Sequence, residues 1–198
     1  DLEWRRIWPL FLGAAPGVSI SAGIVIAHHK TPLREVLKDA HALLEGVAKK
    51  KAGRNAFAVR LKKRSGGDRD FCCKWDQENP FLPGETILAS FREIVRGVGT
   101  AFSSSLLYRL SALKDGIDPM KDSLALHRYK IVRMYQYEVS HSGLPKDIDP
   151  HGAERLAGIT LATEGGEIRR ASDGTPVDDW FTPETAVIAD FLAGKERI

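Results

Sequence analysis

Residues 19–55 decide the fold of this chain; they read SISAGIVIAHHKTPLREVLKDAHALLEGVAKKKAGRN. From Val18 to Ala27, aliphatic residues alternate with small or polar residues, and this period of two predicts a strand. Thr31 is a favoured N-cap residue and a proline follows it, so we expect a helix over Leu33–Lys51. A second strand is expected over Ala56–Lys62. The stretch therefore predicts a strand–helix–strand unit.

One apolar stripe runs along the predicted helix, and we expect this stripe to pack on the sheet. It consists of Leu33, Val36, Leu37, Ala40, Leu44, Val47 and Ala48. Three lysines, Lys49–Lys51, form the last turn, where the helix dipole favours cations, and Gly53 ends the helix. The unit therefore carries a cationic corner at Lys49–Arg54.

A β-hairpin is predicted directly after this unit. The sequences AFAVRLKKR and DFCCKWD both read as strands, and they flank Ser65–Asp70, which contains the letters GGD. Glycine-rich pairs between two strands are typical of hairpin turns. We therefore interpret Gly66–Asp68 as a turn, with a catalytic acidic hairpin as the alternative.

The remainder of the chain reads as helical. A loop with two prolines covers residues 76–84, and helical periodicity begins at Glu85. Helices are expected over residues 85–98, 103–114, 119–142, 153–162 and 182–192, with a loop over 164–179. In the longest helix the residues expected to face inward are Leu124, Ile131, Val132, Tyr135 and Val139. The predicted fold class is α+β, a β-α-β piece with a hairpin followed by an all-helical bundle.

The composition is that of a soluble globular protein, with 198 residues and a formal net charge of +3. The basic charge is local, because eight Lys or Arg and no acid lie between Gly46 and Gly67. No run of apolar residues is long enough for a membrane helix. The adjacent Cys72 and Cys73 favour reduced thiols and a cytoplasmic protein. The sequence opens with neither an initiator Met nor a signal peptide, so we expect it to be a piece of a longer protein.

Two of these sequences carry a family resemblance. SAGIVIAHHKTPLREVL and AKKKAGRNAFAVRLKKRSGG resemble the large polymerase–cyclase subunit of type III-B (Cmr) CRISPR effector complexes, within the superfamily of GGDEF and palm-type cyclases. The resemblance is specific over Val18–Gly67 and looser over the helical remainder. It implies that residues 1–76 are the end of a ferredoxin-like palm and that residues 77–198 are a thumb-like helical domain.

For the cationic corner, the resemblance implies a nucleotide site. In the cyclase families, the Lys three residues before the glycine and the Arg after it face the triphosphate, and here these are Lys50 and Arg54. Ser21 and Lys30 are further candidates for lining the pocket. Arg can hold a phosphate bidentately and Lys supplies a point charge. The alternative is a solvated helix end that complements the dipole, with Ser21 and Lys30 packed or exposed.

A second basic group lies on the next strand and its turn. Its members are Arg60, Lys62, Lys63 and Arg64. Such a strip could bind an RNA backbone without reading its sequence. The alternative is an exposed hairpin whose charged edge discourages strand pairing.

The resemblance also implies what the complete subunit does in antiviral defence. Its palm converts ATP into cyclic oligoadenylates with two metal ions, magnesium or manganese, on GGDD acids that we do not find in this sequence. We therefore expect no catalytic or metal-binding residue here, and no activity from this chain alone. The resemblance implies that this chain forms one wall of the ATP site and, with its helical part, a surface for subunit and RNA contacts. The implied partners are the rest of the subunit, other subunits, guide RNA and target RNA in a cytoplasmic ribonucleoprotein complex, with no membrane. The alternatives are a diguanylate-cyclase-like signalling domain and a non-catalytic RNA-binding scaffold.

Overall fold

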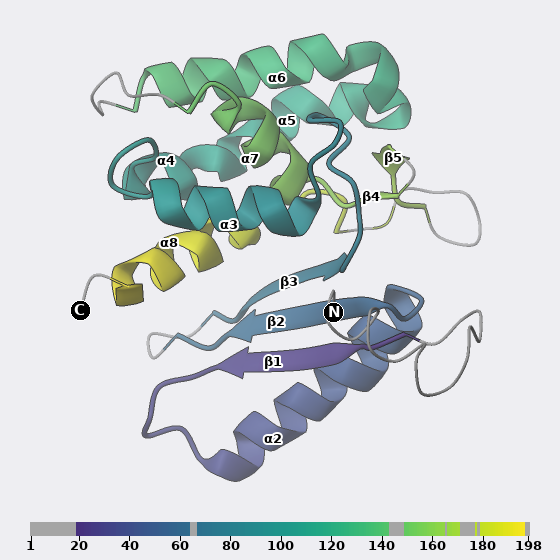
Figure 1. The fold of residues 1–198 in the computed structure, drawn as a ribbon, viewed down its shortest axis with the longest axis vertical. Coiled ribbons are helices and arrows are strands. Elements are labelled where there is room, and N and C mark those ends of the chain that lie inside the picture. Colours follow the sequence, from purple (N-terminus) through teal and green to yellow (C-terminus); the bar gives the residue numbers. More distant parts are fainter. Residues whose placement is uncertain are drawn as a thin grey trace. The chain divides into compact units, whose positions relative to one another are not determined.

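The computed structural model has a mixed α+β fold, which confirms the predicted class (Figure 1). Its contacts divide the chain into two compact units, Asp1–Trp75 and Asp76–Ile198. The residues it describes are 19–63, 67–142, 149–164, 166–170, 177 and 179–196. Among these residues, every helix is too short or too polar to span a membrane.

The first unit is the predicted strand–helix–strand with a hairpin. Its elements are β1 (Ala22–Ile26), α2 (Leu33–Ala42), η1 (Leu43–Lys51), β2 (Ala56–Leu61) and β3 (Arg69–Lys74). β1 and β2 are parallel, with Ala22 opposite Phe57. β2 and β3 are antiparallel, with Leu61 opposite Arg69, so the predicted hairpin pairing is confirmed. The turn residues 64–66 lie outside the described part.

Small residues let the helix approach the sheet closely. A β-carbon on Gly23 would collide with the carbonyl oxygen of Ala40 and would lie 2.8 Å from the amide nitrogen of Leu44. The core beneath consists of Leu43, Ala48, Ala52, Ala56 and Ala58. A glycine and several alanines therefore set the distance between the helical layer and β1.

The predicted helical stripe is wrong at Leu33 and Leu37, whereas Val36 and Ala40 are half-buried. Leu33 and Leu37 are 70% and 60% exposed, while Leu43, which the stripe omitted, is 1% exposed. Both exposed leucines lie in α2, ahead of η1, and the fully buried positions of the helical segment lie in η1, a π-helix with a wider turn. Residues five apart, Leu43 and Ala48, then face the sheet together.

The start of the helix also differs from the prediction. The cap position is Pro32 instead of Thr31, and no side chain caps the helix. The Pro32 carbonyl accepts hydrogen bonds from the amides of Glu35 and Val36. Thr31 instead donates its amide to the carbonyl of His28, which closes a turn after β1.

The second unit is mainly helical. Its elements are α3 (Ile87–Gly97), α4 (Ser104–Arg109), η2 (Leu110–Leu113), α5 (Lys114–Ile117), η3 (Asp118–Ser123), α6 (Leu124–Ser140), α7 (Gly152–Thr160), β4 (Thr163–Glu164), β5 (Glu167–Ile168) and α8 (Glu184–Glu196). α7 packs against α3, α6 and α8, and most of its residues are buried. All five residues expected to face inward from the longest helix are buried on α6, which confirms that prediction.

Three expectations for this unit differ from the structure. The helix expected over residues 103–114 is divided into α4, η2 and α5, and the longest helix begins at Leu124, because η3 with its proline precedes it. The expected loop over 164–179 includes a short hairpin, β4 and β5.

This hairpin contacts the start of α6. Glu167 of β5 accepts hydrogen bonds from the first amides of α6, Leu124 and Ala125, at 3.0 and 3.3 Å. Part of that loop, residues 165, 171–176 and 178, lies outside the description.

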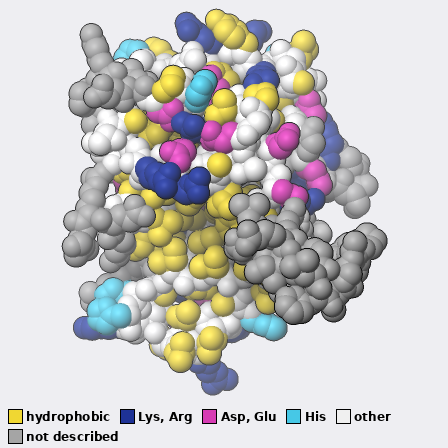
Figure 2. Space-filling view, in the orientation of Figure 1, with side chains coloured by type: hydrophobic (Ala, Val, Ile, Leu, Met, Phe, Trp, Pro, Cys, Tyr) yellow, Lys and Arg dark blue, Asp and Glu magenta, His cyan; other side chains and the backbone are white. Residues whose placement is uncertain are grey.

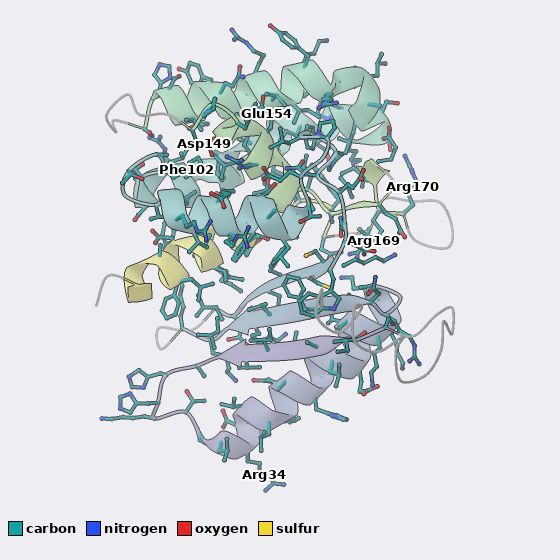
Figure 3. The ribbon with its side chains drawn as sticks, viewed as in Figure 1. Arg34, Phe102, Asp149, Glu154, Arg169 and Arg170 are labelled. Atoms are coloured by element: carbon teal, nitrogen blue, oxygen red, sulfur yellow. The ribbon has the colours of Figure 1, made fainter. Side chains whose placement is uncertain are left out.

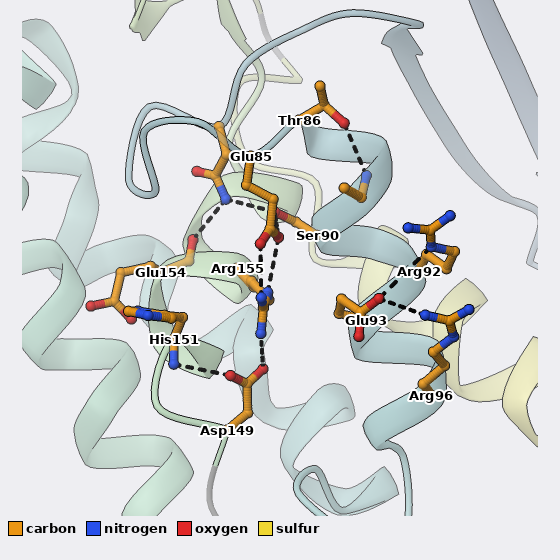
Figure 4. Close-up of polar contacts among 12 residues, drawn as sticks. Glu85, Thr86, Ser90, Arg92, Glu93, Arg96, Asp149, His151, Glu154 and Arg155 are labelled. Carbon is orange, nitrogen blue, oxygen red and sulfur yellow. Dashed lines mark hydrogen bonds and ion pairs between the residues drawn. The ribbon is translucent and has the colours of Figure 1, made fainter. Parts of the chain in front are cut away.

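An ion-pair network joins the start of α3 to α7 (Figure 4). Arg155 donates to both carboxylate oxygens of Glu85, at 2.9 and 2.7 Å, and also pairs with Asp149. Ser90 donates to Glu85 at 2.7 Å, and Asn79 donates to Ser90 at 2.9 Å. The hydrogen bonds from Arg155 lower the pKa of the Glu85 carboxyl. The network therefore holds the loop before α3 on the helical core.

Candidate functional site

The cationic corner lies where the helix ends and the strands begin. Because β1 and β2 are parallel, the helix between them must return, which places its C-terminal turn beside the first residues of both strands. The register of Ala22 opposite Phe57 sets Ser21 next to the start of β2. One edge of the sheet therefore gathers Ser21, the lysines of η1 and Arg54.

The turn that presents Arg54 has an unusual backbone. Gly53, Arg54 and Asn55 have φ angles of 73°, 68° and 53°, so each lies in the left-handed region. The amide of Arg54 donates to the carbonyl of Ala48 at 3.1 Å, which closes the end of the π-helix. Glycine and asparagine tolerate this conformation, whereas an arginine is strained in it by about 1–2 kcal/mol. Such strain is often found at functional sites.

The charges at this corner are not equivalent. Lys49 donates to Glu45 at 2.6 Å, and this hydrogen bond lowers the pKa of the Glu45 carboxyl. Lys50 and Arg54 are both exposed, and neither has an ion-pair partner within the described residues. These two cations are therefore available to an anionic ligand, whereas Lys49 is partly neutralised.

Lys30 lies away from the other three predicted nucleotide contacts. It follows the end of β1, whereas Ser21 precedes the start of that strand. The five residues of β1 separate the two positions by roughly 17 Å of extended chain. The structure thus brings Ser21, Lys50 and Arg54 to one edge, and it leaves Lys30 at the opposite edge, where its amide donates to the ring of His28.

The predicted RNA strip is engaged in ion pairs. Arg60 donates to both carboxylate oxygens of Asp70, at 2.8 and 2.6 Å, and lies 3.6 Å from Asp39. Lys62 donates to Asp39 at 2.5 Å, and this bond lowers the pKa of the Asp39 carboxyl. Lys63 is half-buried and has an interaction of its own. Arg64 lies outside the described residues.

Metal ligands were not expected in this chain. Within the part that the structure describes, no three His, Cys, Asp or Glu side chains are grouped to hold an ion. Asp68, in the GGD letters, lies 3.8 Å from the Nε of Arg60.

Sequence reasoning missed two features of the corner. The π-helix has no signal that we recognise in the residue pattern. The left-handed Arg54 could have been suspected from its place between Gly53 and Asn55, two residue types that favour positive φ.

Two comparisons with known proteins bear on this site. Residues 8–58 match the family model for the second palm domain of Cas10/Cmr2, a range that includes Ser21, Lys50 and Arg54. The CRISPR system Cmr subunit Cmr2 of Pyrococcus furiosus is 36% identical over 106 residues, which are 53% of this chain and 12% of that protein. The chain thus spans about an eighth of the length of this relative. Both comparisons confirm the resemblance to the large subunit of type III-B CRISPR complexes.

Proposed function

We propose that this chain forms one wall of an ATP site in a type III CRISPR large subunit, whose palm makes cyclic oligoadenylates. The observation that carries the proposal is the pair Lys50 and Arg54. Both are exposed and have no ion-pair partner within the described residues, and both lie in the range that matches the palm family. A solvated helix end would not need a strained arginine at its tip.

The chemistry of these donors fits a triphosphate. The planar guanidinium of Arg54 can donate to two phosphate oxygens, and the ammonium of Lys50 adds a compact positive charge. Ser21, at the same edge, offers a hydroxyl. Lys30 lies too far along β1 to share the phosphates with them, so we assign it no phosphate contact.

The described residues do not fit the divalent ions that the palm chemistry uses. They contain no group of three acidic or other ligating side chains, so we derive no step through a metal. This chain would bind and orient the phosphates, and the acids for magnesium or manganese would come from elsewhere in the subunit. Its further partners would be the other subunits and the RNAs of the complex.

The test is ATP binding by the complete large subunit that carries this chain. Arg54→Ala should weaken ATP binding by about 10- to 100-fold, the scale of one charge-assisted hydrogen bond. Arg54→Lys should restore it only partly, because an ammonium cannot reproduce a bidentate contact. Lys38→Ala, which removes an exposed cation from α2, is the matched control and should leave binding unchanged.

If Arg54→Ala and Lys50→Ala both bind ATP like the wild type, the nucleotide wall is disproved and a scaffold role is favoured.

A second measurement addresses catalysis. The purified 198-residue chain should make no cyclic nucleotide from ATP with magnesium or manganese. Turnover that Asp68→Asn abolishes would show that the GGD letters are a catalytic hairpin.

A further inference from the structure

α6 has an outer face that the fold does not use. One side of the helix packs on the rest of the second unit. Its buried residues include Leu124, Ile131, Tyr135 and Val139. Positions 126, 129, 130, 133 and 137 recur at helical spacing on the opposite side. Side chains project outward along the whole helix (Figure 3).

This outer face combines aromatic and basic side chains. Tyr129 and Tyr137 are 75% and 61% exposed, and Leu126 is 78% exposed. Lys130 and Arg133 lie between the two tyrosines and are also exposed. Figure 2 shows hydrophobic and basic side chains at the edge of the second unit where α6 lies.

The cations of this face are not neutralised within the described residues. Arg133 donates only to the neutral amide of Gln136, at 3.3 Å, and Lys130 has no ion pair there. None of the five outward positions carries a carboxylate. Glu138, at the margin, pairs with Arg109 of α4 at 3.6 Å.

The outer face is extended at its C-terminal end by a ring contact. The rings of Tyr137 and His141 lie with centroids 4.0 Å apart and an angle of 30° between their planes. The two rings are tilted and lie over each other, so His141 covers one face of Tyr137, while the tyrosine as a whole stays 61% exposed. Such exposed rings are suited to stacking with nucleobases.

We propose that the outer face of α6, defined by Leu126, Tyr129, Lys130, Arg133 and Tyr137, binds single-stranded RNA. Bases stack on the two tyrosines, and Lys130 and Arg133 contact the phosphates between them. Tyr129 and Tyr137 are separated by about 12 Å along the helix axis, which matches about three to four stacked nucleotides. No base-edge readout is expected, so binding should be largely independent of sequence.

Charge decides between RNA and a protein partner. Tyrosine and arginine are also common in protein interfaces, but lysine is depleted there. Lys130 and Arg133 are exposed, and none of the five positions carries a carboxylate, which suits the phosphates of RNA. The basic strip on β2 is a weaker candidate for RNA, because Arg60 and Lys62 are already paired with Asp39 and Asp70. The inference rests on the proposed function only for the source of the RNA, since the ATP wall lies in the other unit.

The experiment uses the full 198-residue chain and a fluorescein-labelled oligouridine of about ten nucleotides. Tyr129→Ala and Tyr137→Ala should each weaken binding by about 5- to 100-fold, whereas Tyr→Phe at either position should bind like the wild type. Lys130→Gln and Arg133→Gln should each reduce the slope of log affinity against log salt by about 0.7. Lys38→Gln makes the same charge change on α2 and should alter neither the affinity for oligouridine nor the dependence of that affinity on salt.

Three results would overturn the proposal. They are unchanged oligouridine binding by the double Tyr→Ala variant, equal weakening by Tyr→Phe, and stronger binding of a duplex of the same length. Loss of a subunit from the assembled complex, with oligouridine binding retained, would assign the face to a protein partner instead. ATP binding by the Arg54 variants is measured separately, so failure of either proposal can be distinguished from failure of the other.

Discussion

Gly23 of β1 lies so close to Ala40 of α2 that a β-carbon on the glycine would collide with the alanine's carbonyl oxygen. The glycine is the last residue of the sequence Ser21–Gly23, which runs into the start of the strand. Its role is therefore to let the helix backbone approach the sheet, since its φ is not in the left-handed region. This approach sets where the C-terminal turn of the helix, with Lys50, meets the edge of the sheet.

We expect Gly23→Ala to destabilise the first unit by about 1–3 kcal/mol, because the helix must move to accommodate the methyl group. Urea unfolding would measure this loss of unfolding free energy. Hydrogen exchange of the β2 amides would show whether the loss falls on the first unit. Gly46→Ala is the matched control, because nothing lies within 4 Å of its added carbon. That change should be neutral or stabilise the helix by up to about 1 kcal/mol. Equal effects of the two changes would contradict the close approach.

Leu43 should be the most costly leucine of the helix to truncate. Because it is buried beneath the sheet, Leu43→Ala should lower the free energy of unfolding by about 2–5 kcal/mol. Leu37→Ala should change it by less than about 0.5 kcal/mol, since that side chain is exposed. Denaturant unfolding of the two variants decides between this face and the stripe expected from a regular helix, which would reverse the order.

The contrast between Leu43 and Leu37 shows what the sequence could predict in this unit. The second strand and the ends of the helical segment followed from alternation, a proline and a glycine, because these signals act locally. The first strand did not, because β1 covers Ala22–Ile26 and residues 19–21 of the expected Val18–Ala27 are not part of it. The buried face did not follow, because it depends on a change of helical period within η1 that the residue pattern does not reveal. The stripe was drawn at 3.6 residues per turn, the period of a regular α-helix, through a segment with a wider turn.

The candidate sites show a related limit. Arg60 and Lys62 looked like free cations because no acid is near them in the sequence. Their partners, Asp39 and Asp70, come from the helix and from the next strand. For Lys50 and Arg54 the local geometry could be predicted, because it follows from the helix end and Gly53, and their contact with a nucleotide stays a prediction.

Glu85 should make the stability of the second unit depend on acid. Its pKa is lowered in the folded state by Arg155, so the unfolded state binds the proton more readily. The stabilisation is present above the unfolded pKa, near about 4.3, and is lost as pH falls through the folded pKa. At neutral pH, Glu85→Gln should cost about 1–3 kcal/mol, and this difference from the wild type should begin to shrink below the unfolded pKa, near about 4.3, and vanish as the pH falls through the lowered pKa of folded Glu85.

Urea midpoints at neutral and acid pH would test this pH dependence. Glu93→Gln is the control, because Glu93 pairs with Arg96 on the exposed surface of α3 and should matter by less than about 0.5 kcal/mol at any pH. A Glu85→Gln variant that stays equally weaker than the wild type at both pH values would show that packing, and not charge, accounts for the loss.

We expect Arg54 to lower the free energy of unfolding while it contributes to binding of the proposed ligand. Its φ of 68° suits glycine, so Arg54→Gly should remove about 1–2 kcal/mol of strain. The greater freedom of glycine in the unfolded chain offsets about 0.5–1 kcal/mol of this gain. We therefore expect Arg54→Gly to be up to about 1.5 kcal/mol more stable than the wild type, while its ATP affinity falls about 10- to 100-fold.

Urea unfolding and ATP titration of the same subunit preparations would measure both effects. Arg54→Lys keeps the strain and a positive charge, so its stability should equal that of the wild type, with an ATP affinity between those of the wild type and the Arg54→Gly variant. Lys50→Ala should lower ATP affinity without the gain in stability, because Lys50 lies in η1 and has no positive φ. If Arg54→Gly instead loses stability and keeps ATP binding, the arginine braces the turn and the phosphate contact must be assigned elsewhere.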